Sequence, residues 1–279
     1  MYDAVSLSDA PLLQRAVGEL RVEARACDGR TILDGLRQAG CLKARFPRPL
    51  SHGWMDVVTL NTSGGIASGD TLASTFAVAP AARISIAGQA AERFYRALPG
   101  TEPARVTTRI AVADGAAAEW LPQEAILFDR CAVRRHLRIE LAATAWFLGV
   151  ESLVFGRAAM GERVEQASLR DVIELRRDGE LVLRDAIRLD GEVAATMQRP
   201  AIANGARAVG TIVYVAPDAE RRLEMLRDLP SESQFGTSTW NGMLIARAVA
   251  PDGGSLRGLV VSVLRVLRGD RPLPRVWLC

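Results

Sequence analysis

Polar and apolar side chains alternate without a break over residues 19 to 26, and the same two-residue period returns three times later in the chain. Successive side chains of a β-strand point to opposite faces, so each such segment places one face on a core and the other in water. The later segments span Thr71–Val78, Arg105–Val112 and His136–Leu141. A chain with this pattern is expected to form many half-buried strands.

Helical patterns appear only late in the chain. Pro217 sets the first-turn φ angle of a predicted helix that runs to about Leu229, and Pro230 stops it. Ser255 is the candidate N-cap of a second helix, which ends before Gly269. The second helix has a broad apolar stripe formed by Leu256, Leu259, Val260, Val263, Leu264 and Leu267.

A long run of strands followed by two helices argues against the strand–helix alternation of parallel α/β folds. Two β-type runs within Val172–Ile187 flank Asp178-Gly179, a dipeptide that favours a tight hairpin turn. A length of 279 residues allows one large domain or two small ones, but no repeat, low-complexity tract or convincing linker is recognisable. We therefore predict a mostly β fold, with packed sheets and two α-helices in the C-terminal part of a single domain over residues 1–279.

Composition excludes several classes of protein. The formal net charge of +3 is too small to imply a nucleic-acid partner, and Lys43 is the only lysine among dispersed basic residues. The first residues lack the cationic lead and apolar stretch of a signal peptide, so we expect a cytoplasmic protein. The longest apolar helical stretch, Leu256–Leu267, contains two arginines and is too short to span a bilayer.

Residues suited to catalysis or metal binding are few. The four cysteines form no CxxC pair and no zinc-spaced cluster with histidine. Cys131 has arginines nearby that could lower its pKa, but no positioned base, so we interpret it as a structural residue. His136 falls within a predicted strand and His52 within a loop, outside any nucleophile or metal motif. These observations favour a protein that is not an enzyme.

The segment Gly64–Thr71 nearly matches the phosphate-cradling pattern GxxxxGK[ST]. Asp70 stands where the phosphate-binding lysine belongs, and alternating strand sequence follows where a helix should begin. Both features argue against a nucleotide site. Two interpretations remain open: a glycine-rich turn between strands, or a bent backbone that presents Asp70.

Three later segments also combine acids or aromatic residues with turn signals. Ala90–Arg96 places an aromatic pair between two arginines, which suits a sheet face or a protein interface. Trp120–Glu124 joins a large aromatic residue, a strand-ending proline and an acid. Gly156–Glu162 has two glycines and ends on an acid, which suggests another turn.

In their order along the chain, these segments resemble the urease accessory protein UreD family, called UreH in some organisms. The resemblance covers nearly the whole chain: Arg15–Leu20, Gly64–Asp70, Glu92–Arg96, Trp120–Glu124, Gly156–Glu162, Arg268-Gly269 and Pro274–Trp277. Each segment is weak alone, but their shared order makes a chance match improbable. This chain departs from the family where Cys41 replaces an expected proline and where Phe94 replaces a small aliphatic residue.

The resemblance implies a β-rich fold with two helices and a protein that works with others. Members of the family bind apo-urease and join UreF and the GTPase UreG in a complex that delivers nickel to the urease active site. Nucleotide hydrolysis then belongs to the partner, which agrees with the missing lysine at position 70. The rival interpretations are a β-fold hydrolase that uses Cys131 or a histidine, and a carbohydrate-binding β-sandwich.

The resemblance also suggests a role for three acids beside turns. We predict that Asp70, Glu124 and Glu162 contribute to nickel passage or shape its path, because oxygen ligands release Ni²⁺ more readily than imidazole or thiolate. Ordinary ion pairs with arginine are the alternative. No stable metal site or tightly bound cofactor is expected, only transient Ni²⁺. The structural residues of the family motifs are Gly64, Gly65, Gly69, Tyr95, Arg96, Trp120, Pro122, Gln123, Gly156, Arg157 and Gly161.

Overall fold

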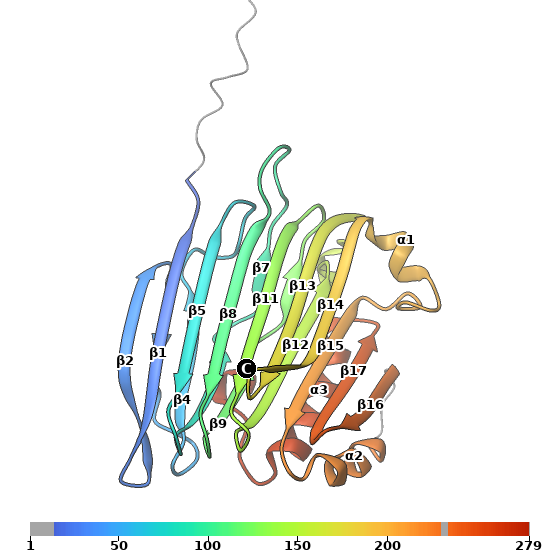
Figure 1. Cartoon of the computed structure of the whole chain (residues 1–279). Coiled ribbons are helices and arrows are strands. Elements are labelled where there is room, and N and C mark those ends of the chain that lie inside the picture. Colours follow the sequence, from blue (N-terminus) through green and yellow to red (C-terminus); the bar gives the residue numbers. More distant parts are fainter. Residues whose placement is uncertain (1–13, 230–233, 279) are drawn as a thin grey trace, which may run out of the picture.

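The computed structural model describes residues 14–229 and 234–278, and its chain forms two β-sheets packed face to face (Figure 1). Seven strands make up sheet A. Their order across the sheet is β14 (Glu180–Glu192), β13 (Gln166–Arg177), β11 (Ala132–Leu141), β8 (Ala104–Val112), β5 (Thr71–Val78), β1 (Val17–Cys27) and β2 (Arg30–Gly40).

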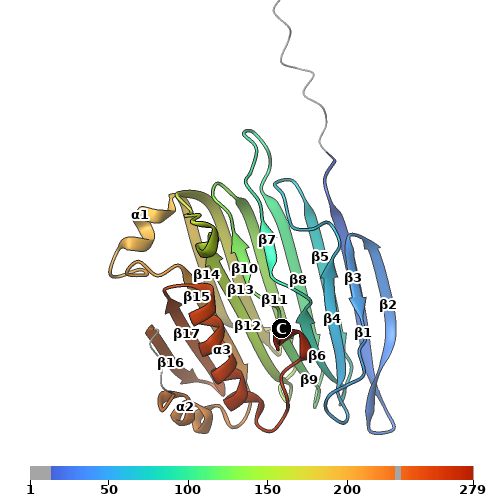
Figure 2. The same ribbon diagram turned by 180° about the vertical axis from the view of Figure 1, so that it is seen from behind.

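Sheet B has ten strands and carries α2 (Ala219–Arg227) and α3 (Gly253–Arg268) on its outer face (Figure 2). Its main order is β16 (Gln234–Trp240), β17 (Met243–Ala250), β15 (Ala208–Val215), β12 (Trp146–Phe155), β9 (Ala117–Leu121), β6 (Arg83–Gly88), β4 (Met55–Asn61) and β3 (Leu42–Arg45). Two short strands, β7 (Glu92–Phe94) and β10 (Ala125–Leu127), pair beside β12. The predicted mostly β fold is confirmed.

Between β4 and β13 the chain passes back and forth between the sheets, so each new strand lies parallel to a strand laid down one coil earlier. At one end of this solenoid, strands of sheet A pass to sheet B through four-residue turns such as 113–116. The turns stack on one another, because the Ala113 N–H donates to Val78 O at 3.0 Å and the Ala142 N–H to Val112 O at 2.9 Å. The coils thus form a structural repeat that the sequence does not reveal.

The main core fills the space between the sheets, and the predicted strands supply it as their alternation requires. Along β1 the buried side chains are Leu20, Val22 and Ala24, and the residues between them face outward. The hairpin prediction is also correct, since Asp178 and Gly179 link β13 to β14 with φ angles of 51° and 80°. Fully buried leucine and valine side chains such as Leu20 and Val22 each contribute roughly 1.5–3 kcal/mol to folding.

Both predicted helices are present, as α2 (Ala219–Arg227) and α3 (Gly253–Arg268). The apolar stripe of α3 packs on the outer face of sheet B and forms a second core there. The predicted N-cap Ser255 is wrong: Asp252 caps α3, and the Ser255 N–H donates to its Oδ1 at 2.8 Å. Pro230, the predicted stop of α2, lies outside the described residues.

The sequence did not predict the short α1 (Val193–Gln198) or the 3₁₀ turns η1 (Ala158–Met160) and η2 (Arg275–Trp277). Among the described helices, none has the length and apolarity needed to cross a bilayer.

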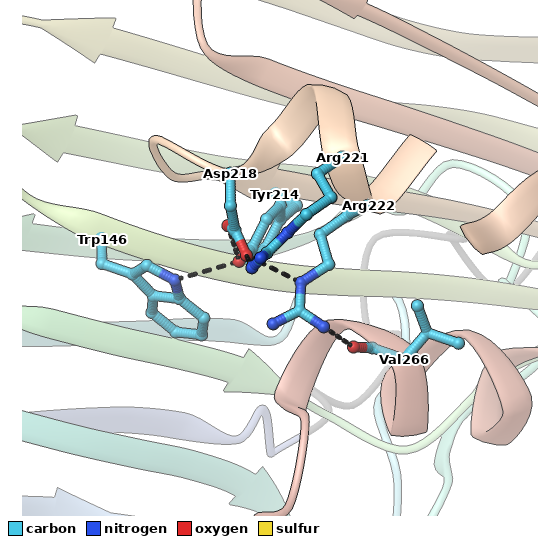
Figure 3. Close-up of polar contacts among 6 residues, drawn as sticks. All are labelled: Trp146, Tyr214, Asp218, Arg221, Arg222 and Val266. Atoms are coloured by element: carbon cyan, nitrogen blue, oxygen red, sulfur yellow. Dashed lines mark hydrogen bonds and ion pairs between the residues drawn. The ribbon is translucent and has the colours of Figure 1, made fainter. Parts of the chain in front are cut away.

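A polar network ties α2 and α3 to sheet B (Figure 3). Tyr214 of β15 donates its hydroxyl to Asp218 Oδ1 at 2.6 Å and accepts from Trp146 Nε1 at 3.4 Å. Arg222 of α2 donates from Nε to Asp218 Oδ2 at 2.8 Å and from Nη1 to the Val266 carbonyl of α3 at 2.7 Å. Partial burial alone would raise the pKa of Asp218, but the hydrogen bonds from Tyr214 and Arg222 outweigh it and lower that pKa.

Candidate functional site

The loops that lead from sheet B to sheet A all lie at one end of the solenoid, here called the loop end (Figure 2). They contain the four motif segments that the sequence spreads over about a hundred residues. Parallel pairing of β7 with β10, and of β10 with β12, places three of these segments side by side. Bridges between Ile66 and Phe94, and between Arg96 and Cys131, join the remaining loop and β11 to them. The loop end therefore assembles the segments into one surface.

Gly64 and Gly65 form a turn against the ring of Tyr95. Their φ angles are +79° and +138°, a region that residues with a Cβ rarely adopt. A Cβ at Gly65 would lie 2.4 Å from Tyr95 Cε2, and the Tyr95 hydroxyl donates to Gly64 O at 2.7 Å. These glycines are required by close packing and positive φ, which supports the glycine-rich turn interpretation.

Asp70 is buried and stabilises the same loop through backbone groups. Its carboxylate accepts hydrogen bonds from the Ala16 N–H and the Ala67 N–H, both at 2.8 Å. The first bond fastens the start of β1 to the loop, and the second closes the turn. Gly69, with φ of +87°, lies against the Arg15 side chain. Asp70 therefore has backbone partners rather than the arginine partner of the alternative interpretation.

Glu124 and Gln123 are held from outside the solenoid by Arg257 of α3. Arg257 Nη1 donates to Glu124 Oε1 at 3.0 Å and also to Gln123 Oε1. The Gln123 side-chain amide donates to Val276 O at 2.8 Å, and Arg257 Nη2 donates to Trp277 O at 3.0 Å. This segment fixes α3 and the C-terminal η2 onto the loop end.

Glu162 closes the loop between β12 and β13. Arg157 Nε donates to Glu162 Oε2 at 2.7 Å, and the Asp129 N–H donates to Oε1 at 3.4 Å. Gly156 has a φ of +79°, and a Cβ there would lie 2.7 Å from Glu162 O. Gly161 ends η1 in the left-handed conformation. Glu162 thus forms an arginine ion pair within a tight turn.

Asp70, Glu124 and Glu162 lie in three different loops of the same end, and no described hydrogen bond or ion pair joins any two of them. Each stabilises the conformation of its own loop. A direct contact with nickel and a part in shaping its path both stay predictions.

A cavity of about 260 Å³ lies between the sheets and opens at the loop end. Its lining includes the exposed Gly64, Gln89 and Ala90, with Pro122 beside them. Deeper in, the walls are formed by residues of β8, β9, β11 and β12. Three of the four family-motif segments therefore form the mouth of an internal cavity, and Gly156–Glu162 contributes no residue to its lining.

Charged residues lie at the deep end of this cavity. Arg135 of β11 forms ion pairs with Glu151 of β12 and, at 2.9 Å, with Asp171 of β13. Trp120 donates from its ring nitrogen to Glu151 Oε1 at 2.7 Å. The side chains of Glu151 and Asp171 are each only 7% exposed, so this cluster lies inside the body of the protein. The single positive charge of Arg135 neutralises only part of the negative charge of Glu151 and Asp171.

A third acid, Glu92, lines the same cavity nearer its mouth. Asn61 Nδ2 donates to Glu92 Oε1 at 3.2 Å. Burial raises the pKa of Glu92, and it raises the pKa of Asp171 to about 6, with help from nearby Glu151 and against the opposing effect of Arg135. The carboxylates of Glu92 and Asp171 are therefore held in an environment that disfavours their charge.

The line of acids continues past the cavity. Asp185 of β14 shares a small adjoining hollow with Glu151 and Asp171. On its far side, Asp185 Oδ1 lies 2.7 Å from Nη2 of Arg247, whose side chain is half exposed on β17. Carboxylates thus extend from the loop end through the interior to the side of the solenoid where β14 faces β17.

Sequence reasoning did not nominate Glu92, Arg135, Glu151, Asp171 or Asp185. A usable signal existed for three of them. Glu151 interrupts the apolar run of β12, and Asp171 and Asp185 occupy inward positions of β13 and β14 where the alternation calls for apolar residues. A charged residue at an inward strand position indicates a buried polar cluster.

The remaining candidates for catalysis lie in unsuitable surroundings. Burial raises the pKa of the Cys131 thiol to about 12, which leaves little thiolate at neutral pH. His136 Nε2 lies 3.1 Å from Glu174 on the outer face of sheet A, and His52 is exposed in a turn. Cys279 lies outside the described residues. Within the described residues, no three His, Cys, Asp or Glu side chains are arranged to hold a metal ion together.

Comparison with known proteins identifies the family of the chain. A family model described as UreD urease accessory protein matches residues 16–278. The urease accessory protein UreD of Xanthobacter autotrophicus is 43% identical over 274 residues, covering 98% of this chain and 93% of the relative. The UreD proteins of Dinoroseobacter shibae and Rhizobium rhizogenes are 44% identical over 270 residues and 41% identical over 264 residues, covering 96% and 95% of this chain and 94% and 96% of the relatives. The chain therefore belongs to the UreD family of urease accessory proteins.

Proposed function

We propose that this chain is a non-catalytic maturation factor that binds apo-urease and, together with UreF and the GTPase UreG, enables nickel delivery to the urease active site in the cytoplasm. Family membership supports a role in urease maturation. UreG binds through UreF in this scheme, and the chain holds no cofactor tightly.

The observation that carries the nickel role is the acid-lined cavity between the sheets. It places Glu92, Glu151 and Asp171 around an internal space that opens at the loop end. Carboxylate oxygens hold Ni²⁺ less tightly than imidazole or thiolate, so an ion can exchange from one to the next. A passage with this chemistry would accept the ion transiently and release it.

Asp70, Glu124 and Glu162 complete the proposal by shaping the entrance. The hydrogen bonds of Asp70 and the ion pair of Glu124 hold two of the loops that form the cavity mouth, and the ion pair of Glu162 holds the adjoining loop between β12 and β13. In this scheme the three acids keep the entrance of the path open and do not contact the ion over the rest of its length. Loss of any one of them would then reduce partner binding or soluble yield before it changed nickel transfer.

Glu92→Gln tests the passage most directly, because the glutamine oxygen can still accept from Asn61 while the charge is lost. Glu102→Gln is the matched control, since Glu102 lies in the same loop region with its side chain 78% exposed. The measurements are urease activity and nickel content at limiting nickel, beside co-purification with UreF and apo-urease. We expect Glu92→Gln alone to lower both nickel measurements while partner binding is retained.

Two results would reject parts of the proposal separately. If Glu92→Gln combined with Asp171→Asn activates urease as well as the parent, the passage through the cavity is wrong. If the parent fails to co-purify with folded UreF and apo-urease, the role as an adaptor is wrong.

A further inference from the structure

The outer face of sheet A carries two rows of arginines that the sequence did not reveal. Strand register places Arg105, Arg134, Arg170 and Arg188 side by side on β8, β11, β13 and β14, here called the upper arginine row. Adjacent strands lie about 4.8 Å apart, so the row is about 14 Å long. All four side chains are on the exposed face, and no helix lies over it (Figure 1).

A lower arginine row crosses the same strands four residues further along. It consists of Arg109, Arg138 and Arg184, with Glu174 between the last two. Four residues of strand correspond to about 13 Å, so the rows run parallel at that separation. Between them lies an uncharged strip at neutral pH, formed by Thr107, His136, Val172 and Ala186.

Most of this positive charge has no paired counter-charge among the residues that the structure describes. Arg134, Arg170 and Arg188 make no hydrogen bond or ion pair with any described residue, and Arg105 meets only the exposed Glu102 at 3.5 Å. In the lower row, Glu174 pairs with Arg184 at 3.4 Å and Arg138 at 3.9 Å, while Arg109 has no described partner. Like charges on directly opposed strand positions are destabilising, so the upper row opposes folding instead of supporting it.

We propose that this face binds an acidic α-helix of a partner protein, seated on the uncharged strip between the two arginine rows. A helix with its side chains is about 10–12 Å wide, which matches the separation of the rows. Three helical turns span about 16 Å, so acids spaced three or four residues apart on one flank can follow the four arginines of the upper row. Guanidinium groups bind carboxylates through paired charge-assisted hydrogen bonds.

A helix fits this face better than a nucleic acid does. The strip offers no Phe, Tyr or Trp on which a base could stack, and the formal net charge of the chain is only +3. The inference goes beyond the proposed function, because it holds whether or not nickel passes through the cavity on the other side of the sheet.

The test uses the full chain and a synthetic helical peptide of about 20 residues with glutamates along both flanks. The variant is Arg134→Gln with Arg170→Gln. The matched control is Arg21→Gln with Arg37→Gln, since these arginines lie on the same face but pair with Glu23 at 2.5 Å and Glu19 at 2.9 Å. We expect the peptide Kd at low salt to rise at least tenfold for the variant and less than twofold for the control.

Folding and specificity are measured beside affinity. The variant should melt at or above the temperature of the parent, because it relieves repulsion, and binding by the parent should weaken as salt is added. Arg134→Lys with Arg170→Lys should restore part of the affinity. The proposal is overturned if the parent does not bind the peptide, or if Arg134→Gln with Arg170→Gln loses no more affinity than the control Arg21→Gln with Arg37→Gln. It is also overturned if single-stranded or duplex DNA of matched charge binds the parent more tightly than the peptide does.

Discussion

The carboxylate of Asp171 lies 2.9 Å from Nη1 of Arg135 in the space between the two sheets, yet burial still raises the pKa of Asp171 to about 6. The ordinary value is 3.8, so the native state binds this proton more tightly than the unfolded chain does. Between about pH 4 and 6 the native state therefore carries more protons. The contribution of Asp171 to the free energy of unfolding falls as the pH rises through that window, by on the order of 2–3 kcal/mol.

Asp171→Asn should remove this fall, because the variant has no group to titrate at that position. Urea unfolding of parent and variant at several pH values from 4 to 7 measures it. The difference between their free energies of unfolding should change with pH below 6 and level off above it. A difference that stays constant across the range would show that Asp171 titrates normally.

Arg135→Gln should cost about 3–5 kcal/mol of stability, because it leaves Glu151 and Asp171 buried without their counter-charge. Arg134→Gln is the control: it lies on the same strand one residue away, points outward and should change stability by less than about 0.5 kcal/mol. Chemical denaturation of both variants at pH 7 gives the comparison. Equal losses would mean that Arg135 is not the residue that neutralises the cluster.

Tyr214→Phe should destabilise the chain by about 1.5–3 kcal/mol, because the hydroxyl of this buried residue donates to the charged, partly buried carboxylate of Asp218. Tyr95→Phe removes a bond to the neutral carbonyl of Gly64 at the surface and should cost less, about 0.5–1.5 kcal/mol. The fall in melting temperature relative to the parent ranks the two variants. The reverse ranking would argue that the network of Figure 3 does not secure the helices.

Asp70→Asn should reduce soluble yield and partner binding more than Glu124→Gln or Glu162→Gln. An aspartate accepts from both Ala16 and Ala67, whereas an asparagine amide would present N–H groups to one of those donors. Glutamine at positions 124 and 162 can still accept from Arg257 and Arg157. Co-purification and urease activation are scored for each single variant and the triple. If the triple activates urease as well as the parent at limiting nickel, the three acids have no part in nickel transfer.

The strands predicted in sheet A were recognisable because each carries its own two-residue period, as β5 shows over the whole of Thr71–Val78. Strands β12 and β15 of sheet B lack this period because they are buried along nearly their whole length. The pairing of strands was not predictable, because β5 joins β8 across about thirty residues and periodicity contains no information about partners. The N-cap was misplaced because Asp252 precedes two glycines, which obscure the helix start, whereas Ser255 directly precedes the apolar stripe.

The sequence predicted residues at the mouth of the candidate site but not the residues in its interior. Gly64, Gly65 and Asp70 stand out in the sequence because turns require special residues. Arg135 and Glu151 lie in strands sixteen residues apart in sequence, and their contact exists only once β11 and β12 face each other from opposite sheets. Such a contact depends on which face of each strand turns inward, and so on the register of every coil before it.

The stacking of the coils also determines at which step of folding the cavity forms. Each strand of sheet A from β5 to β13 rests on the one laid down a coil earlier, so the body should grow by addition of successive coils. Arg135, Glu151 and Asp171 arrive on three successive strands, β11, β12 and β13. Until β13 docks, the half-built cavity would hold an arginine and a glutamate open to water, so we expect the docking of β13 to be the folding step that closes the cavity.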